Sequence, residues 1–322
     1  MTRLALLLLP LLGALASCGD GSGTQEPAAT KGTLPIAAEE RPQTLSSAVT
    51  EESRVPLWEV SDPDTIVYMI GTVPLIPPGT NWQNQGVRAA FGQASTVFLE
   101  ADFISREGQR SMGVVVAQTA ELRSGKTLTQ LYKGSDRETV TDALSTIGAS
   151  ASEFGTFRPW FAAVQSRTLA QVAAGGDPAG QLDIVIAREA VEGGKRLRYL
   201  ESAADMLAVQ AAGRDEEDAP YLLALLERLA LGQPYYADIL SAWYEGDLDR
   251  LDFLLNGPIY AAPPQVKERV IIERHQSWAQ QLDRVLTDEK GIFLVAIPAG
   301  HMVGDESLPT HLRRRGYEVK RY

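Results

Sequence analysis

The stretch GIFLVAIPAGH, residues 291–301, is the part of the sequence that most clearly decides the fold. Its first seven residues form an unbroken apolar run of strand length, which is typical of a strand buried on both faces of a sheet. We therefore expect it to be a central strand, with His301 just beyond its carboxyl end. Other segments with strand character are PLWEV (56–60), TIVYMI (65–70), TVFLE (96–100), RLRYLE (196–201) and YEVKRY (317–322). The first two are separated by the turn SDPD and should form a hairpin.

Helical periodicity fills most of the chain between these strands. The pattern predicts an α/β (or α+β) fold, with a mixed central sheet of about six strands and many surrounding helices. Asp177-Pro178 has the residues of a helix start, and Gly193-Gly194 those of its end. The other predicted helices are 84–94, several pieces between 105 and 174, several between 203 and 256 with breaks at Pro220 and 232–234, a long helix over 264–287, and 308–316.

The first 52 residues do not belong to this fold. Arg3 precedes an apolar segment, LALLLLPLLGAL, that is too short to span a bilayer and resembles a secretory signal. Small residues then lead to Cys18, the one cysteine of the chain, in an arrangement that resembles the bacterial lipoprotein box. The resemblance implies a signal peptide over 1–17, a lipidated Cys18 and a membrane anchor in the cell envelope, facing the periplasm. An ordinary signal peptide with a chance cysteine is the alternative.

The composition of residues 18–52 predicts a disordered tether, because this segment is rich in Gly, Pro, Ser, Thr and charged residues and poor in large apolar ones. The folded domain is expected over 53–322, without an internal disulfide since no second cysteine exists. Gly19 follows the cysteine where an aspartate would suggest retention in the inner membrane, which slightly favours the outer membrane. The formal net charge of −11 argues against nucleic acid as a partner.

Polar residues collect where the predicted strands end. Glu100 closes one strand with Asp102 two residues on, Glu201 closes another, and His301 follows the central one. Ligands of α/β sheets bind at the carboxyl ends of strands, so these side chains predict a pocket there. Pro74 stands at the equivalent place after TIVYMIGT, and a proline side chain neither binds a metal nor moves a proton.

Five segments in register resemble the TraB/GumN family: LWEVSDPDTIVYMIGT, PPGTNWQNQGVRAAFGQASTVFLEAD, FRPWFAA, GQLDIVIAREAVEGGKRLRYLES and FLVAIPAGHMVGDESLPTHLRRRGYEV. The resemblance covers roughly 55–322. It implies a fold like that of erythromycin esterase-like and ChaN-like proteins, and a relation to the TIKI proteins, which are metal-dependent proteases. Biological role does not follow from membership, because the family also includes GumN and plasmid pheromone-response proteins.

The family pattern implies a metal site of two Gly-X-X-His histidines and a glutamate, which would leave a position open for an activated water. This sequence departs from that pattern at Pro74, where the first histidine is missing, and at Pro298, where the second motif lacks its glycine. Glu100 and His301 remain as metal ligands, if any metal binds. Asp183 and Glu201 also match the family pattern.

Replacement ligands are scarce, because the chain has three histidines. His311 is predicted to lie on the surface of the last helix. His275 falls on the apolar stripe of the long helix, where the family commonly shows Arg-Asn in place of Arg274-His275. It is either a core-edge histidine bonded to a neighbour or a relocated ligand beside Glu100 and His301, and Asp102 could also supply an oxygen.

Two functions follow from this pattern. The first is a lipid-anchored pseudoenzyme, without a cofactor, that binds an envelope protein or peptide. The second is a metal-dependent hydrolase, peptidase-like and using Zn, Mn or Co, whose site has been rebuilt with His275 or Asp102. The two hypotheses differ in whether His275 lies near Glu100 and His301.

Overall fold

The computed structural model describes residues 53–77, 79–177 and 180–322. Ser53–Tyr322 form one compact unit with its own core. The signal peptide, Cys18 and the tether predicted before it lie outside the described residues. Among the described helices, none is long and apolar enough to cross a membrane.

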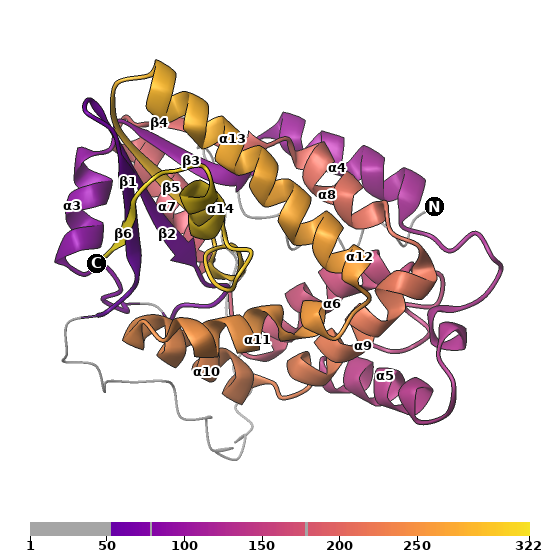
Figure 1. The fold of residues 1–322 in the computed structure, drawn as a ribbon. Coiled ribbons are helices and arrows are strands. Elements are labelled where there is room, and N and C mark those ends of the chain that lie inside the picture. Colours follow the sequence, from indigo (N-terminus) through magenta and orange to yellow (C-terminus); the bar gives the residue numbers. More distant parts are fainter. Residues whose placement is uncertain (1–52, 78, 178–179) are drawn as a thin grey trace, which may run out of the picture. The chain divides into compact units, whose positions relative to one another are not determined.

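A six-stranded mixed sheet lies at one end of this unit (Figure 1). Its order is β4-β3-β5-β2-β1-β6, and the four strands from β4 to β2 run parallel. The hairpin of β1 and β2 is confirmed, and β5 is central as predicted. The strands are β1 Leu57–Ser61, β2 Thr65–Thr72, β3 Thr96–Ala101, β4 Arg196–Glu201, β5 Gly291–Pro298 and β6 Val319–Arg321.

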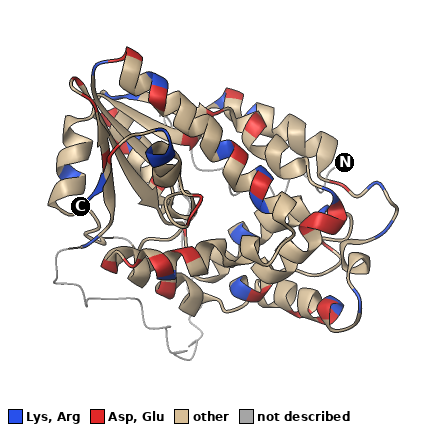
Figure 2. Cartoon of the chain, viewed as in Figure 1, with Lys and Arg blue, Asp and Glu red and all other residues tan. Residues whose placement is uncertain are grey.

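Helices cover both faces of the sheet and extend beyond its carboxyl edge (Figure 1). The main helices are α3 Gln85–Gln93, α4 Arg106–Thr119, α5 Gly134–Thr146, α6 Pro159–Ala173, α7 Leu182–Glu192, α8 Ala203–Ala211, α9 Asp215–Leu229, α10 Gln233–Glu245, α11 Leu248–Tyr260, α13 Glu273–Asp288 and α14 Leu308–Arg314. The central strands β2 and β5 carry no charged side chain, whereas the helices together carry both signs (Figure 2).

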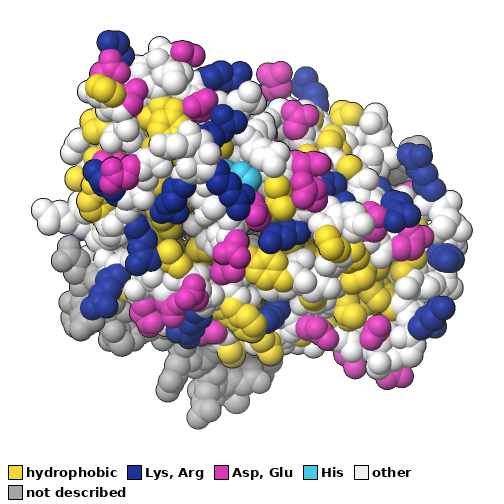
Figure 3. Space-filling model, in the orientation of Figure 1, with side chains coloured by type: hydrophobic (Ala, Val, Ile, Leu, Met, Phe, Trp, Pro, Cys, Tyr) yellow, Lys and Arg dark blue, Asp and Glu magenta, His cyan; other side chains and the backbone are white. Residues whose placement is uncertain are grey.

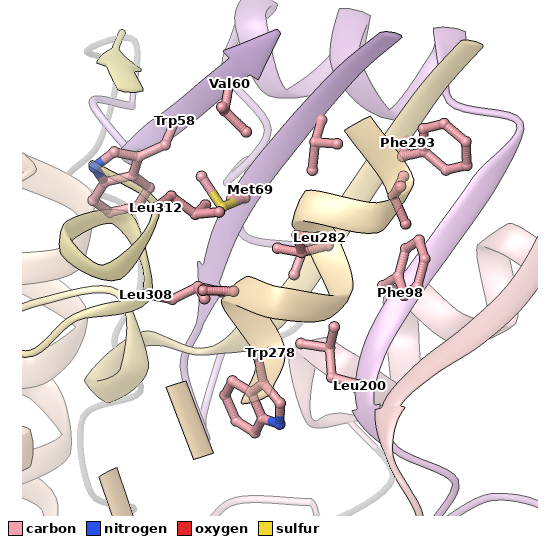
Figure 4. Close-up of a cluster of buried hydrophobic side chains, with 14 of the residues drawn as sticks. Trp58, Val60, Met69, Phe98, Leu200, Trp278, Leu282, Phe293, Leu308 and Leu312 are labelled. Atoms are coloured by element: carbon pink, nitrogen blue, oxygen red, sulfur yellow. The ribbon is translucent and has the colours of Figure 1, made fainter. Parts of the chain in front are cut away.

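The core forms where α13 and α14 pack on one face of the sheet (Figure 4). Trp278 and Leu282 of α13 meet Met69, Phe98 and Phe293 from three neighbouring strands. Helices α3 and α7 contact the sheet as well, and the side chains from Phe293 to Ile297 of β5 are all buried. Burial of such a side chain contributes about 1.5–3 kcal/mol, so this layer accounts for much of the stability of the domain.

Three helix predictions need correction. Helix α7 begins at Leu182 and not at Asp177-Pro178, and ahead of it the Gly180 N–H donates to the Asp177 carbonyl at 2.9 Å. Pro220 lies inside α9 and does not break it, since the helix is held by a buried apolar face that includes Leu222 and Leu226. The long helix over 264–287 is divided into α12 (Pro264–Lys267), a π turn η3 (Glu268–Ile272) and α13.

Candidate functional site

The parallel strands bring the predicted side chains to one edge of the sheet. Glu100 is the last but one residue of β3 and Glu201 the last of β4, and Ala101 pairs with Glu201 in the ladder. His301 ends the short turn η4 (Ala299–His301) that follows β5. The Nε2 atom of His301 lies 3.9 Å from Oε1 of Glu100. The structure thus brings together Glu100, Glu201 and His301, as the strand-end pattern predicts.

Arg274 of α13 occupies the centre of this group. Its guanidinium donates to both Glu100 Oε1 and Glu201 Oε1, and its Nε lies 3.3 Å from the other Glu201 oxygen. The side chains of Arg274, Glu100 and Glu201 are 4 %, 14 % and 11 % exposed. Charges buried to this extent require partners, so the three residues form one ion-paired unit.

Arg274 makes three further contacts. Its Nη1 lies 3.3 Å from the carbonyl of Val270 in the π turn and 3.5 Å from Nε2 of His301. Its guanidinium also stacks on the ring of Trp278, 4.6 Å from the centroid. Burial acts to lower the pKa of Arg274, but Glu100 and Glu201 outweigh it and raise that pKa. Arg274 therefore remains a cation in the site.

The histidines of α13, η4 and α14 form a second group beside it. The Nε2 of His275 lies 2.8 Å from Nδ1 of His301, and the Nδ1 of His275 contacts the backbone carbonyl of Glu306. His311 is buried and not on the surface as predicted, because the turn of α14 that carries Leu308 and Leu312 packs on the core. Burial, with the positive charges of Arg274 and Arg167, holds the pKa of His301 well below its usual value. Burial likewise lowers the pKa of His275 to about 4.

Asp102 does not join the group. Its carboxylate accepts from the backbone N–H groups of Ile104 and Ser105, at 3.3 and 2.9 Å, and from the Ser105 hydroxyl at 2.5 Å. These bonds fix the turn that leads into α4, where Ser105 is the N-cap. Asp102 therefore stabilises the turn through these hydrogen bonds, which is a common role for an aspartate.

The departures from the family pattern lie at the ends of adjacent strands. Pro298 pairs with Thr72 in the ladder of β5 and β2, and Pro74 follows two residues later. The carbonyl of Pro74 accepts a hydrogen bond from Gln171 of α6. The contribution of Pro74 to this edge is thus made by its backbone, and its ring offers no ligand atom.

Asp183 lies near the group, at the start of α7. Burial raises its pKa from 3.8 to about 6, against the opposing effect of the Ile184 N–H, and the negative charge of Glu100 raises it further. Asp183 is half-buried and retains some accessible surface. Ionisation of its carboxylate at neutral pH therefore lowers the stability of the folded state.

We expect Asp183→Asn to stabilise the protein at neutral pH. A raised folded-state pKa means that stability falls as pH rises from about 4 to about 6 and stays low above it. Asparagine does not titrate, so the variant should gain about 1 kcal/mol near pH 7.5 and about a third of that near pH 4.5. Urea unfolding at the two pH values measures the difference, and an equal gain at both would contradict the assignment.

Arg167 is a residue that strand-end reasoning missed. It is the one charged residue of α6, it donates to the hydroxyl of Tyr221, and its charge contributes to the lowered pKa of His301. Its side chain is exposed. A lone charge in a helix that has no other charged residue is the signal that could have found it.

A separate hollow of about 650 Å³ lies beside the segment that follows His301. Trp58, Asp252, Tyr260 and Arg313 line it together with Met302, while Glu100, Glu201 and His301 do not. On the face shown in Figure 3, basic and acidic side chains are interspersed with apolar ones. The hollow is thus a mixed polar surface, distinct from the ion-paired group.

The donor atoms of the site do not fit a metal centre with three protein ligands. Among residues 53–77, 79–177 and 180–322, no group of three or more His, Cys, Asp or Glu residues is placed to hold an ion. Glu100 and Glu201 face a guanidinium, and His275 has both ring nitrogens engaged by protein atoms. A cation is already present at the point where these carboxylates meet.

The fold and site define an α/β domain with a polar group at the carboxyl edge of its parallel strands. Comparison with protein families matches residues 56–321 to the TraB/PrgY/gumN family, so the chain belongs to that family. No curated protein and no solved structure matches the chain. The predicted family resemblance is therefore confirmed, over nearly the whole folded chain.

Proposed function

We propose that this protein is a lipid-anchored member of the TraB/PrgY/gumN family that binds a partner in the bacterial envelope without metal-dependent catalysis. The observation that carries this proposal is Arg274, whose guanidinium is paired with both Glu100 and Glu201. A divalent ion at this position would need these carboxylates as ligands and would be repelled by the buried arginine. The arginine thus supplies the positive charge that a metal would otherwise provide.

The positions that depart from the family pattern support the same reading. Pro74 has no side-chain donor where the pattern implies a histidine. His275 lies beside His301 and passes the simple distance test for a rebuilt site. However, both of its nitrogens are already used, one on His301 and one on the Glu306 carbonyl. A ligand role for His275 would therefore require it to give up a buried hydrogen bond.

The membrane anchor in this proposal rests on the sequence before residue 53. Cys18 follows a short apolar segment and small residues, which resembles a lipoprotein signal. Attachment of several acyl chains at Cys18 would hold the domain firmly at a membrane, and the tether would separate the two. The polar hollow beside Met302 offers a peptide or protein partner a recess on the folded unit.

A metal-dependent hydrolase is the second candidate, and one distance favours it. Nε2 of His301 lies 3.9 Å from Oε1 of Glu100, so both could face one ion if Arg274 moved out. Glu201, released from Arg274, would then be the available third ligand. Each missing or engaged ligand lowers the affinity of such a site, and metal binding is therefore the property that separates the two candidates.

Calorimetry with Zn²⁺, Mn²⁺ and Co²⁺ on residues 53–322 tests the proposal. We expect no one-to-one binding below millimolar metal, because Arg274 neutralises the carboxylates and Pro74 supplies no ligand. His301→Ala and His311→Gln are the matched variants, since only the first removes a residue of the site. Tight binding that is lost in His301→Ala and kept in His311→Gln would overturn the proposal and favour the hydrolase.

Restoring the missing ligand gives a positive control for the same experiment. In Pro74→His combined with Arg274→Ala, the competing cation is gone and a second imidazole is present. We expect one-to-one zinc binding to appear in this double variant if the edge of the sheet retains the geometry implied by the family pattern.

A further inference from the structure

The three histidines of the chain are gathered in one buried row, although they come from α13, η4 and α14. The rings of His275 and His301 are 5.0 Å apart, and those of His275 and His311 are 5.9 Å apart. His275 is fully buried and central in this row. The neighbours of His275 show which of its two ring nitrogens carries a proton and which carries a lone pair.

The first assignment concerns Nδ1 of His275. This atom contacts the backbone carbonyl of Glu306, and a carbonyl oxygen can only accept a hydrogen bond. Nδ1 of His275 must therefore carry a proton. The Glu306 segment is held in place, because the Glu306 carboxylate pairs with Arg314 and lies 3.0 Å from Nε2 of His311.

The second assignment concerns the charge of His275. The ring has no accessible surface, packs 5.3 Å from the Trp278 ring and is next to the cation Arg274. No carboxylate accepts from either of its nitrogens, since the two partners are a carbonyl and an imidazole. A charged imidazole here would be desolvated and repelled, so His275 is neutral and its Nε2 carries a lone pair.

We infer that His275 is a positioning residue that fixes the tautomer of His301. With a lone pair on Nε2 of His275, the hydrogen bond of 2.8 Å requires Nδ1 of His301 to be the donor. The neutral His301 ring then has its lone pair on Nε2, the atom that faces Arg274 at 3.5 Å and Glu100 at 3.9 Å. The Glu306 carbonyl thus determines, through His275, which nitrogen of His301 is basic in the site.

This arrangement gives the site a fixed hydrogen-bond acceptor. Nε2 of His301 can accept from Arg274 or from an N–H or O–H group of a bound molecule, and it cannot donate. Without His275, His301 would be free to adopt the other tautomer, which presents a donor to the cation of Arg274. The inference concerns the same site as the proposed function but does not rest on it, because it needs no metal and no ligand.

Nitrogen NMR of residues 53–322, labelled with ¹⁵N in the histidine rings, tests the inference near neutral pH in the presence of a chelator. With three histidines in the chain, single variants assign each ring. We expect His301 to show a protonated Nδ1 and an unprotonated Nε2 in the wild-type protein. A wild-type His301 ring that is charged, or protonated on Nε2, would overturn the inference.

Two substitutions separate positioning from packing. His275→Phe preserves ring volume but removes the acceptor, so the tautomer of His301 protonated on Nε2 should become populated. His275→Gln offers an amide oxygen to His301 and an amide N–H to Glu306, and it should keep the original tautomer. His311→Gln, which keeps a donor for the Glu306 carboxylate, is the control that leaves His301 unchanged. If His275→Phe also leaves His301 unchanged, the inference fails; if that variant does not fold, the wild-type spectrum still decides.

Discussion

Arg274→Met is expected to lower the free energy of unfolding of residues 53–322 by about 3–5 kcal/mol near pH 7.5, because it removes one partner of a buried ion-paired group. Methionine occupies a similar volume, so little of the loss would come from a cavity. The loss arises because Glu100 and Glu201 would face each other without a cation, at 14 % and 11 % exposure. Urea unfolding followed by circular dichroism measures it.

An exposed arginine provides the matched control. Arg250 pairs with Asp238 at the surface, where both side chains are 39 % exposed. Arg250→Met should cost no more than about 1 kcal/mol, because exposed ion pairs contribute little. Equal losses for the two variants would mean that the Arg274 group is not a buried electrostatic unit.

Compensation and pH give two further checks on Arg274→Met. Adding Glu100→Gln and Glu201→Gln should recover a large part of the loss, because no unpaired charge then remains. Burial already raises the pKa of Glu201 in the presence of Arg274. Without the arginine that pKa should rise further, so the folded state would bind a proton more readily than the unfolded state. The loss should therefore shrink as pH falls from about 7.5 to about 5.

The sheet was predictable because each strand is an apolar run with clear boundaries. The run 291–297 has no polar residue to orient one face to water, and only a central strand buries both faces. The helix starts were less predictable. Asp177-Pro178 has the residues of a cap, but those residues are equally suited to a turn, and α7 begins at Leu182. A π turn within residues 264–287 also has the composition of an ordinary helix.

Half of the candidate site could be predicted from position alone. Glu100, Glu201 and His301 follow parallel strands, and such strand ends meet at one edge. Their partners come from α13, and its packing on that edge is a tertiary property that strand ends do not reveal. Even so, Arg274 lies four residues after Val270 and four before Trp278, on the apolar stripe. A charge on such a stripe signals a buried partner.

The burial of His311 was missed for a related reason. Three arginines follow it, and their charge dominates the appearance of the last helix. Leu308, His311 and Leu312 nevertheless have the spacing of one helix face, and that face packs on the core. Helical spacing was the better guide here, because charges at a helix end point to water whichever face is buried.

Gly71→Ala is expected to lower the free energy of unfolding by about 2–3 kcal/mol, since it inserts a methyl group into a contact between backbones. Gly71 is the first glycine of the altered motif in β2 and pairs with Ile297 of β5. A Cβ atom at this position would lie 2.8 Å from Cα and 2.9 Å from Cβ of Ala299. Ala299 begins the turn that carries His301, so relief of the clash would displace that turn.

The consequence for the site distinguishes this effect from ordinary overpacking. If the turn moves, the 2.8 Å bond between His275 and His301 should weaken and the ring signals of His301 should shift. Gly113→Ala is the matched control, because its Cβ would meet nothing within 4 Å. In the interior of α4 the same substitution should stabilise by up to about 1 kcal/mol. The two changes therefore have opposite signs, and only the first should alter His301. If Gly71→Ala leaves both the stability and the His301 signals unchanged, the close contact between Gly71 and Ala299 is not the reason for a glycine at position 71.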